Sequence, residues 1–190
     1  NNRRWRVIGE TLDITLGQLL DQFGRHLGLA SPCGSEIEKL AHKSCKNYIS
    51  LPYSIKGNDV TFSGILSAAK RLNSTNKYTN EDMCYSIQQT AFAMITEAVE
   101  RALSATEKKE LLLVGGVSAN KELSSMLNLA CQRHKVKFNS CPITFAGDNG
   151  AQIAWTGILS YLKSKNFIDI SRSFVNQSWR VDSVDVLWRT

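Results

Sequence analysis

Two glycines that follow a short apolar run form the stretch of this sequence best suited to hold a ligand. Leu111–Val114 is apolar and ends in Gly115 and Gly116, which allow positive φ and a close approach of the backbone to a ligand. Residues 118–120 then lead into a predicted helix. The free N–H groups and positive dipole end of such a helix suit a phosphate or an adenosine edge. We therefore predict a nucleotide-binding turn at Gly115 and Gly116.

A second turn with possible chemistry follows about thirty residues later. After a short predicted strand at Val136–Phe138, Asp148 and Gly150 stand where the next helix should begin. An aspartate there could cap the helix or reach a metal–phosphate complex. Two such turns close together in the sequence indicate one nucleotide site with an acidic metal contact.

A third candidate is the predicted helix Asp13–Leu29. One face is apolar, and the opposite face is a stripe of acid and glycine: Asp13, Gly17, Asp21, Gly24 and Gly28. Each glycine costs about 1 kcal/mol relative to alanine inside a helix, so three of them require a reason. Close approach of another backbone is one reason, and a ligand lying along this face is the other. We favour the ligand, with Asp21 as the acceptor for a ribose hydroxyl pair, because packing alone does not explain the carboxylate.

The elements that must position these residues are predicted from periodicity and punctuation. Strands are expected at Trp5–Ile8, Val60–Phe62, Leu111–Val114, Val136–Phe138 and Val181–Val186, and further helices at Ile65–Leu72, Thr79–Ser104 and Asn149–Lys163. The helix beginning at Thr79 is apolar on more than one face, so it should be central and buried. A five-stranded mixed sheet flanked by helices is the expected architecture.

Basic and aromatic residues alternate near both ends of the chain. Trp5 lies between arginines, and Trp179-Arg180 and Trp188-Arg189 repeat the pairing. Such a pattern can hold a nucleic-acid backbone and stack bases, or it can mark edge strands with alternating faces. Edge strands are the favoured interpretation. The net charge of +6 is compatible with an RNA partner and equally with an ordinary solvated surface.

Composition limits the class of protein. With 190 residues, 43% hydrophobic and 21% charged, the chain has the composition of a globular protein with room for one substantial α/β core or two small ones. No apolar run reaches the roughly 18–20 residues that span a bilayer, and no signal-peptide pattern opens the chain. Five scattered cysteines indicate reduced thiols in the cytosol or nucleus. Since the sequence does not begin with Met, we expect a fragment of a longer protein.

Five ordered motifs carry a resemblance to a known family. They are GETLDITLGQLLDQFGR, CGSEIEKLA, LPYSIKGNDVTFSGIL, VGGVSANKEL and DNGAQIAWTG. Together they resemble the C-terminal half of the tRNA threonylcarbamoyladenosine synthesis family, formerly named O-sialoglycoprotein endopeptidase or glycoprotease-like. The IKGND and TFSG residues and the RVDSVDVLWR ending look like the archaeal and eukaryotic cytosolic branch, the catalytic subunit of the KEOPS complex.

The resemblance implies an actin-like ATPase (ASKHA) fold, in which residues 1–190 are the C-terminal lobe and the N-terminal lobe is absent. It implies transfer of threonylcarbamoyl from threonylcarbamoyl-AMP to the adenosine next to the anticodon of tRNA. Implied partners are tRNA, KEOPS-type subunits including a small protein kinase, and the other lobe, in cytoplasm and nucleus and without a membrane. By motif, the residues that contact ATP or the adenylate are Asp21, Gly34, Glu38, Gly115, Gly116 and Asn120. Without the resemblance, Glu38 is more simply a first-turn acid favoured by the helix dipole.

The resemblance also implies a divalent metal, iron or zinc, with Asp148 as one ligand. The family's H-x-x-x-H ligand pair has no counterpart, because His26, His42 and His134 are never four residues apart. One aspartate cannot supply the three or four protein ligands of such sites. We expect an incomplete metal site and no activity from this chain alone.

Three other functions are alternatives to the transferase. A metal-dependent glycoprotease would need a zinc cluster and a general base such as H-E-x-x-H, which does not occur. A non-catalytic actin-like docking module and a sugar kinase of the same fold group remain open alternatives. Cys33 could be offered as a nucleophile, but nothing basic stands near it in sequence, so an incidental thiol is the better interpretation.

Overall fold

The computed structural model describes residues 4–147 and 150–188. The chain divides into two compact units, and each is described by itself. The large unit is Gly9–Gly147, and the small unit combines residues 1–8 with residues 148–190.

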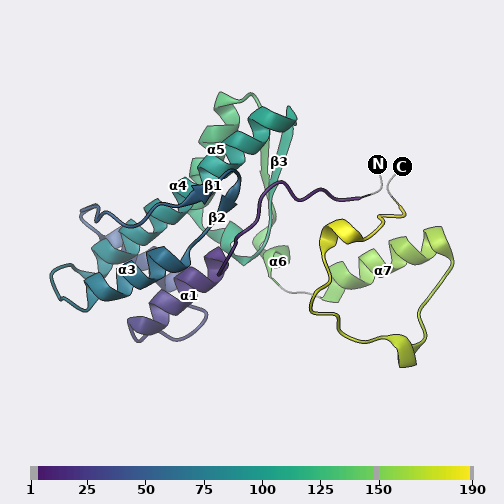
Figure 1. Cartoon of the computed structure of the whole chain (residues 1–190), viewed down its shortest axis with the longest axis horizontal. Coiled ribbons are helices and arrows are strands. Elements are labelled where there is room, and N and C mark those ends of the chain that lie inside the picture. Colours follow the sequence, from purple (N-terminus) through teal and green to yellow (C-terminus); the bar gives the residue numbers. More distant parts are fainter. Residues whose placement is uncertain (1–3, 148–149, 189–190) are drawn as a thin grey trace. The chain divides into compact units, whose positions relative to one another are not determined.

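The large unit is mostly helical, with short strands between the helices (Figure 1). Its helices are α1 (Leu16–His26), α2 (Gly34–Lys43), α3 (Ser63–Asn73), α4 (Asn80–Thr106), α5 (Lys121–Arg133), the short α6 (Ile143–Ala146) and the 3-10 turn η1 (Gly116–Ala119). Its strands are β1 (Ile55–Lys56), β2 (Asp59–Val60), β3 (Glu110–Leu113) and β4 (Lys137–Ser140).

Helix α4 is the centre of the large unit, as its apolar faces predicted. The Thr79 hydroxyl accepts a hydrogen bond from Asp82 N at 3.1 Å and caps its first turn. Along α4 the buried apolar side chains are Met83, Cys84, Ile87, Ala91, Phe92, Met94 and Leu103. Helices α2, α3 and α5 pack against it. Because α4 is apolar on more than one side, it can bury against all three neighbours.

Helix α1 is shorter than predicted, and the predicted start at Asp13 is wrong. Thr15 and Gln18 form a capping box that begins the helix at Leu16. Asp13 lies before the helix, where its carboxylate accepts hydrogen bonds from Phe62 N (2.8 Å) and Ser63 N (2.9 Å) at the start of α3. Asp13 therefore caps α3 and is not part of α1, the helix in which the sequence analysis placed it.

The strands form two ladders of two strands each in the described residues, so the predicted five-stranded sheet is wrong. Strands β1 and β2 pair antiparallel around the turn at Gly57 (φ 64°), and β3 and β4 pair parallel with α5 as the crossover. The predicted strand Val60–Phe62 continues no further than Val60, because the backbone N–H groups of Phe62 and Ser63 bond to the Asp13 carboxylate.

The small unit contains α7 (Gly150–Ser164), which confirms the helix predicted at Asn149–Lys163. The C-terminal end of α7 lies one residue beyond the predicted end. The predicted terminal strands are wrong: Val181–Ser183 forms the 3-10 turn η3, and Trp5–Ile8 forms no strand. The two terminal segments share one isolated antiparallel bridge, between Arg4 and Asp185. A single bridge does not supply the continuous hydrogen bonds that a stable strand needs. None of the helices in residues 4–147 and 150–188 combines the length and apolar character that crossing a membrane requires.

Candidate nucleotide site

The carboxylate of Asp21, on α1, holds the turn that leads into α2. Its Oδ1 accepts hydrogen bonds from Ser31 Oγ (2.8 Å) and Cys33 N (3.0 Å), and Arg25 Nε lies 3.3 Å from Oδ2. The Ser31 hydrogen bond, then the Cys33 N–H, lowers the pKa of Asp21 from its usual 3.8. About a quarter of the side chain stays exposed. Asp21 therefore has a structural partner, and contact with a ribose stays a prediction.

Gly24 supports the packing explanation of the glycine stripe. A Cβ at Gly24 would lie 2.2 Å from Cys33 Cβ, which is closer than non-bonded carbons approach. Cys33 is fully buried, its Sγ lies 3.4 Å from Ala30 O, and burial raises the pKa of its thiol. The thiol is thus a packing group in a tight contact with α1.

Glu38 ties α2 to the start of α5. Its Oε1 accepts a hydrogen bond from Lys121 N at 2.9 Å, the first N–H of α5. Gly34 begins α2, and a Cβ added there would meet no atom within 4 Å. Glu38 and Gly34 therefore lie on the helix that connects the Asp21 turn to α5.

Asn120 is buried and caps α5. Its Oδ1 accepts from Glu122 N (3.0 Å) and Leu123 N (3.1 Å), and its Nδ2 donates to Gln88 Oε1 of α4 at 2.7 Å. Both polar atoms of the side chain have partners within the chain. The predicted nucleotide contact of Asn120 is untested, but its part in fixing the α5 N-terminus is plain.

The glycine turn after β3 is open. Gly115 has φ 91°, and added Cβ atoms at Gly115 and Gly116 would meet nothing within 4 Å. A Cβ added at Gly17 of α1 would lie 3.6 Å from Val117 Cγ2, so α1 and η1 are neighbours. Beside them the buried Ser118 hydroxyl has no partner within the described protein. The open glycine turn thus adjoins the glycine-bearing side of α1.

These contacts bring most of the predicted residues together. The Asp21–Cys33 bond joins α1 to α2, the Glu38–Lys121 bond joins α2 to α5, and Gly17 meets Val117. The acid-bearing helices and the open glycine turn therefore form one connected part of the large unit. Asp148 lies outside the described residues, so the metal contact predicted there has no described geometry.

The described residues do not fit a metal site. In residues 4–147 and 150–188, no three His, Cys, Asp or Glu side chains gather closely enough to hold an ion. His42 Nε2 lies 3.9 Å from Glu38 Oε1, and His134 Nε2 lies 3.8 Å from Glu100 Oε1, each as an isolated pair. No reaction step is therefore derived through a metal.

Three residues of this region were missed by the sequence reasoning. Gln88 carried a signal, since it is a polar residue in the middle of a helix predicted to be buried. Ser118 stood within the recognised glycine turn without a role of its own. Lys121 contributes its backbone N–H, and no sequence pattern reveals which carboxylate that group will meet.

Comparisons with known proteins agree with the motifs. The family model for tRNA N6-adenosine threonylcarbamoyltransferase (TsaD) matches residues 1–155. The chain is 51% identical over 185 residues to a protein of that name from Methanocella arvoryzae, covering 97% of this chain and 56% of the relative. It is 50% identical to a "probable bifunctional tRNA threonylcarbamoyladenosine biosynthesis protein" from Methanothermobacter thermautotrophicus, covering 99% of this chain and 35% of that protein.

A solved structure shares the fold. HypF of T. kodakarensis superposes with a TM-score of 0.61 at 18% identity, over 78% of this chain and 20% of that one. Among the curated relatives, the chain spans about half the length of the single-function proteins and about a third of the length of the bifunctional ones. On the family match and the 51% identity, the chain belongs to the tRNA N6-adenosine threonylcarbamoyltransferase family.

Proposed function

We propose that this chain is the nucleotide-binding part of an enzyme that transfers threonylcarbamoyl from threonylcarbamoyl-AMP to the adenosine next to the anticodon of tRNA. The observation that carries the proposal is the family match over residues 1–155, which includes every described residue of the connected site. Two relatives, at 51% and 48% identity, are named tRNA N6-adenosine threonylcarbamoyltransferase.

The charges of the site favour different places for the phosphate and the sugar of the nucleotide. Backbone N–H groups of the open turn at Gly115 and Gly116 suit the phosphate, whereas a phosphate beside Asp21 or Glu38 would meet like charge. The two carboxylates suit ribose hydroxyls instead. We infer that the adenylate lies with its sugar toward α1 and α2 and its phosphate at the glycine turn.

The chemistry asks little of these side chains. A mixed anhydride is already activated, so the site mainly orients the adenine amine against the carbamoyl carbon and stabilises the leaving phosphate by hydrogen bonds. No side chain among the described residues is assigned as general base. Iron or zinc and ATP stay part of the proposal as ligands of the complete protein, with Asp148 as one metal ligand.

The fold and partners of the complete protein belong to the same proposal. The likeness to HypF supports an actin-like lobe, and the greater length of the relatives supports a second lobe in the same polypeptide. The name of the bifunctional relatives supports a tRNA substrate and fusion to a further domain. The proposal also includes KEOPS-type subunits as partners and a location in the cytoplasm and nucleus. All five cysteines are free, which is compatible with that location.

The test replaces glycines that line open space. At Gly34 and Gly116 an added Cβ would meet no atom within 4 Å, so we expect Gly34→Leu and Gly116→Leu to keep the fold while their side chains fill ligand space. In cells that depend on this protein joined to the remainder of the family polypeptide, we expect at least a tenfold loss of threonylcarbamoyladenosine, measured by mass spectrometry of tRNA nucleosides. Ser67→Leu, at an exposed position of α3, is the control.

Unchanged modification in both glycine variants, with the protein folded, would refute the site and favour a docking module. Cleavage of a peptide that depends on added metal would favour the glycoprotease.

A further inference from the structure

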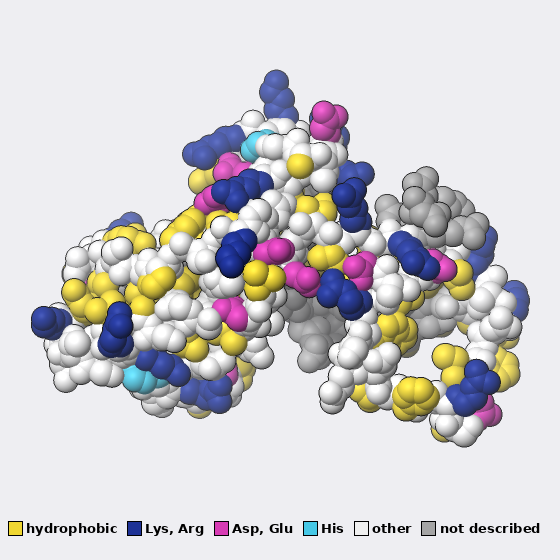
Figure 2. Space-filling view, viewed as in Figure 1, with side chains coloured by type: hydrophobic (Ala, Val, Ile, Leu, Met, Phe, Trp, Pro, Cys, Tyr) yellow, Lys and Arg dark blue, Asp and Glu magenta, His cyan; other side chains and the backbone are white. Residues whose placement is uncertain are grey.

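A pair of amide side chains in the interior of the large unit joins α4 to the start of α5. Gln88, on α4, is 3% exposed, and Asn120, just before α5, is 5% exposed. Asn120 Nδ2 donates a hydrogen bond to Gln88 Oε1 at 2.7 Å. Figure 2 shows charged side chains over the surface of the large unit, whereas these two amides lie inside it. Because burying a polar group costs free energy unless the group is bonded, a glutamine at this position requires a reason.

The hydrogen bonds of Asn120 fix which way its side-chain amide points. Oδ1 accepts from Glu122 N (3.0 Å) and Leu123 N (3.1 Å), while Nδ2 donates to Gln88. In the flipped orientation, Nδ2 would face two N–H donors and Oδ1 would face the Gln88 oxygen, so all three bonds would be lost. Without the Gln88 oxygen, Nδ2 would be a buried donor with no acceptor, which would draw the side chain away from the cap. Gln88 therefore holds Asn120 in the orientation that caps α5.

The glycine turn takes its position from Asn120. Turn η1 (Gly116–Ala119) ends directly before this residue, and Asn120 N donates to Val117 O at 3.0 Å. A Cβ added at Gly115 or Gly116 would meet no atom within 4 Å, so packing does not hold the turn on that side. The groups that hold it lie after the turn, where the chain enters α5.

The first N–H groups of α5 are not free to bind a ligand. Lys121 N donates to Glu38 Oε1, and Glu122 N and Leu123 N donate to Asn120 Oδ1. The helix start that the sequence suggested for a phosphate is thus already bonded within the chain. A phosphate therefore has to bind at the N–H groups of the glycine turn, so the position of that turn decides how well a nucleotide fits.

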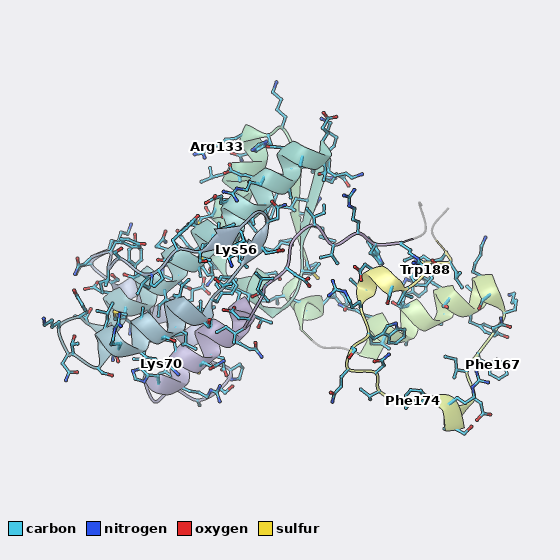
Figure 3. All side chains as sticks on the ribbon, viewed as in Figure 1. Lys56, Lys70, Arg133, Phe167, Phe174 and Trp188 are labelled. Carbon is cyan, nitrogen blue, oxygen red and sulfur yellow. The ribbon has the colours of Figure 1, made fainter. Side chains whose placement is uncertain are left out.

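Gln89, the next residue of α4, offers a matched comparison. Its Nε2 donates to Glu122 Oε1 at 2.9 Å, so it also joins α4 to the first turn of α5. Both glutamines act at the end of α5 opposite Arg133, which is labelled in Figure 3. Of the two, Gln88 alone bonds to Asn120. Attachment of one helix to the other is a role that both glutamines share, whereas orienting the cap belongs to Gln88.

We propose that Gln88 is a positioning residue for the nucleotide: through Asn120 it holds the glycine turn where the turn receives the phosphate of the adenylate. Gln88 acts through Asn120 and does not contact the ligand. The inference rests on the proposed function, because it assumes that a nucleotide binds at the glycine turn. It adds to that function a role for a buried residue of α4.

The test compares Gln88→Met with Gln89→Met in this chain joined to the remainder of the family polypeptide. Methionine keeps the unbranched shape and the helix propensity of glutamine but lacks a strong acceptor. AMP is titrated by calorimetry, which reports the Kd and the fraction of protein that binds as separate quantities. We expect Gln88→Met to raise the Kd for AMP at least fivefold and Gln89→Met to change it less than twofold. A variant that is less stable but still folded keeps its Kd, and misfolded protein lowers only the binding fraction.

A second measurement follows the cap itself. The NMR signals of the Asn120 side-chain NH2 group and the hydrogen exchange of the Glu122 and Leu123 N–H groups are recorded without AMP. In Gln88→Met we expect the NH2 signals to shift and the two N–H groups to exchange at least tenfold faster, with Gln89→Met close to the original protein. If Gln88→Met does not fold, Gln88→Asn serves instead, because its shorter side chain withdraws the oxygen and keeps the amide.

Three results would overturn the inference. Unchanged cap signals in Gln88→Met would show that Gln88 does not orient Asn120. Altered cap signals with an unchanged Kd for AMP would show that the cap does not position the turn. An equal rise of the Kd in the variants of Gln88 and Gln89 would mean that attachment of α5 to α4 is what matters. If the unsubstituted protein binds no AMP, the proposed function fails instead, and the cap signals still report whether Gln88 orients Asn120, so the two failures are distinguishable.

Discussion

Replacing Gly24 with alanine tests whether the glycine stripe of α1 exists for packing. The new Cβ would lie 2.2 Å from Cys33 Cβ, 2.7 Å from its Sγ and 3.6 Å from its Cα. Non-bonded carbons prefer about 3.5–4.0 Å, so the two elements would have to separate by roughly 1.3 Å. The atom in the way is next to the backbone, and the Cys33 N–H is bonded to Asp21, so a rotamer change cannot relieve the contact.

The magnitude follows from two opposing effects. Alanine gains about 1 kcal/mol over glycine inside a helix. Overpacking costs about 1–3 kcal/mol, and shifting Cys33 weakens a hydrogen bond to the Asp21 carboxylate, worth about 1.5–3 kcal/mol. We expect Gly24→Ala to lower the free energy of unfolding by about 1–3 kcal/mol, with a fall in Tm of about 2–4 °C per kcal/mol.

The assay is urea and thermal denaturation followed by circular dichroism, with controls that isolate the contact. Gly34→Ala makes the same chemical change in open space and should be neutral or stabilising. In double variants with Gly24→Ala, Cys33→Gly removes the clashing Cβ and should restore stability relative to the sum of the single changes, whereas Cys33→Ala keeps that Cβ and should not. If Gly24→Ala alone is as stable as the original chain, the packing explanation is wrong.

Three further predictions concern buried polar groups and thiols. Asn120→Ala should cost about 2 kcal/mol or more in urea denaturation, because it removes the α5 cap and leaves Gln88 Oε1 unpaired in the interior. The hydrogen bond from the Ser44 hydroxyl lowers the pKa of Asp82, so the stability it adds is present above about pH 5 and is lost as the pH falls through the folded pKa, below 3.8. At pH 8 a thiol reagent should label exposed Cys45 quickly and buried Cys84, whose pKa is raised to about 12 by burial, only on unfolding.

Each of these has a contrary outcome. A double variant Asn120→Ala/Gln88→Leu that is no more stable than Asn120→Ala would show that the orphaned amide oxygen costs nothing. Asp82→Asn should flatten the acid limb of the stability curve, and an unchanged limb would mean that other carboxylates govern it. Labelling of Cys84 in the folded protein, monitored by mass spectrometry, would show that α4 opens readily.

Local signals were sufficient for the elements that depend on near neighbours. The cap at Thr79 and the apolar faces predicted α4, and the apolar run before Gly115 and Gly116 predicted β3 and its open turn. The start of α1 was within reach as well, because Thr15 and Gln18 have the spacing of a capping box. These features follow from sequence because the groups involved lie within one helical turn or one strand of each other.

Contacts between distant segments were decided by the tertiary structure. Glu38 meets Lys121 N 83 residues away, and Asp13 caps α3 across about fifty residues. A carboxylate presents the same pattern in sequence whether its partner is a ribose, a metal or a distant N–H, so the chain alone could not assign these acids. The sequence determined which groups were available for a nucleotide site. Folding decided which of them already bond to one another, because every buried N–H must find an acceptor and the nearest one in space is often far away in the chain.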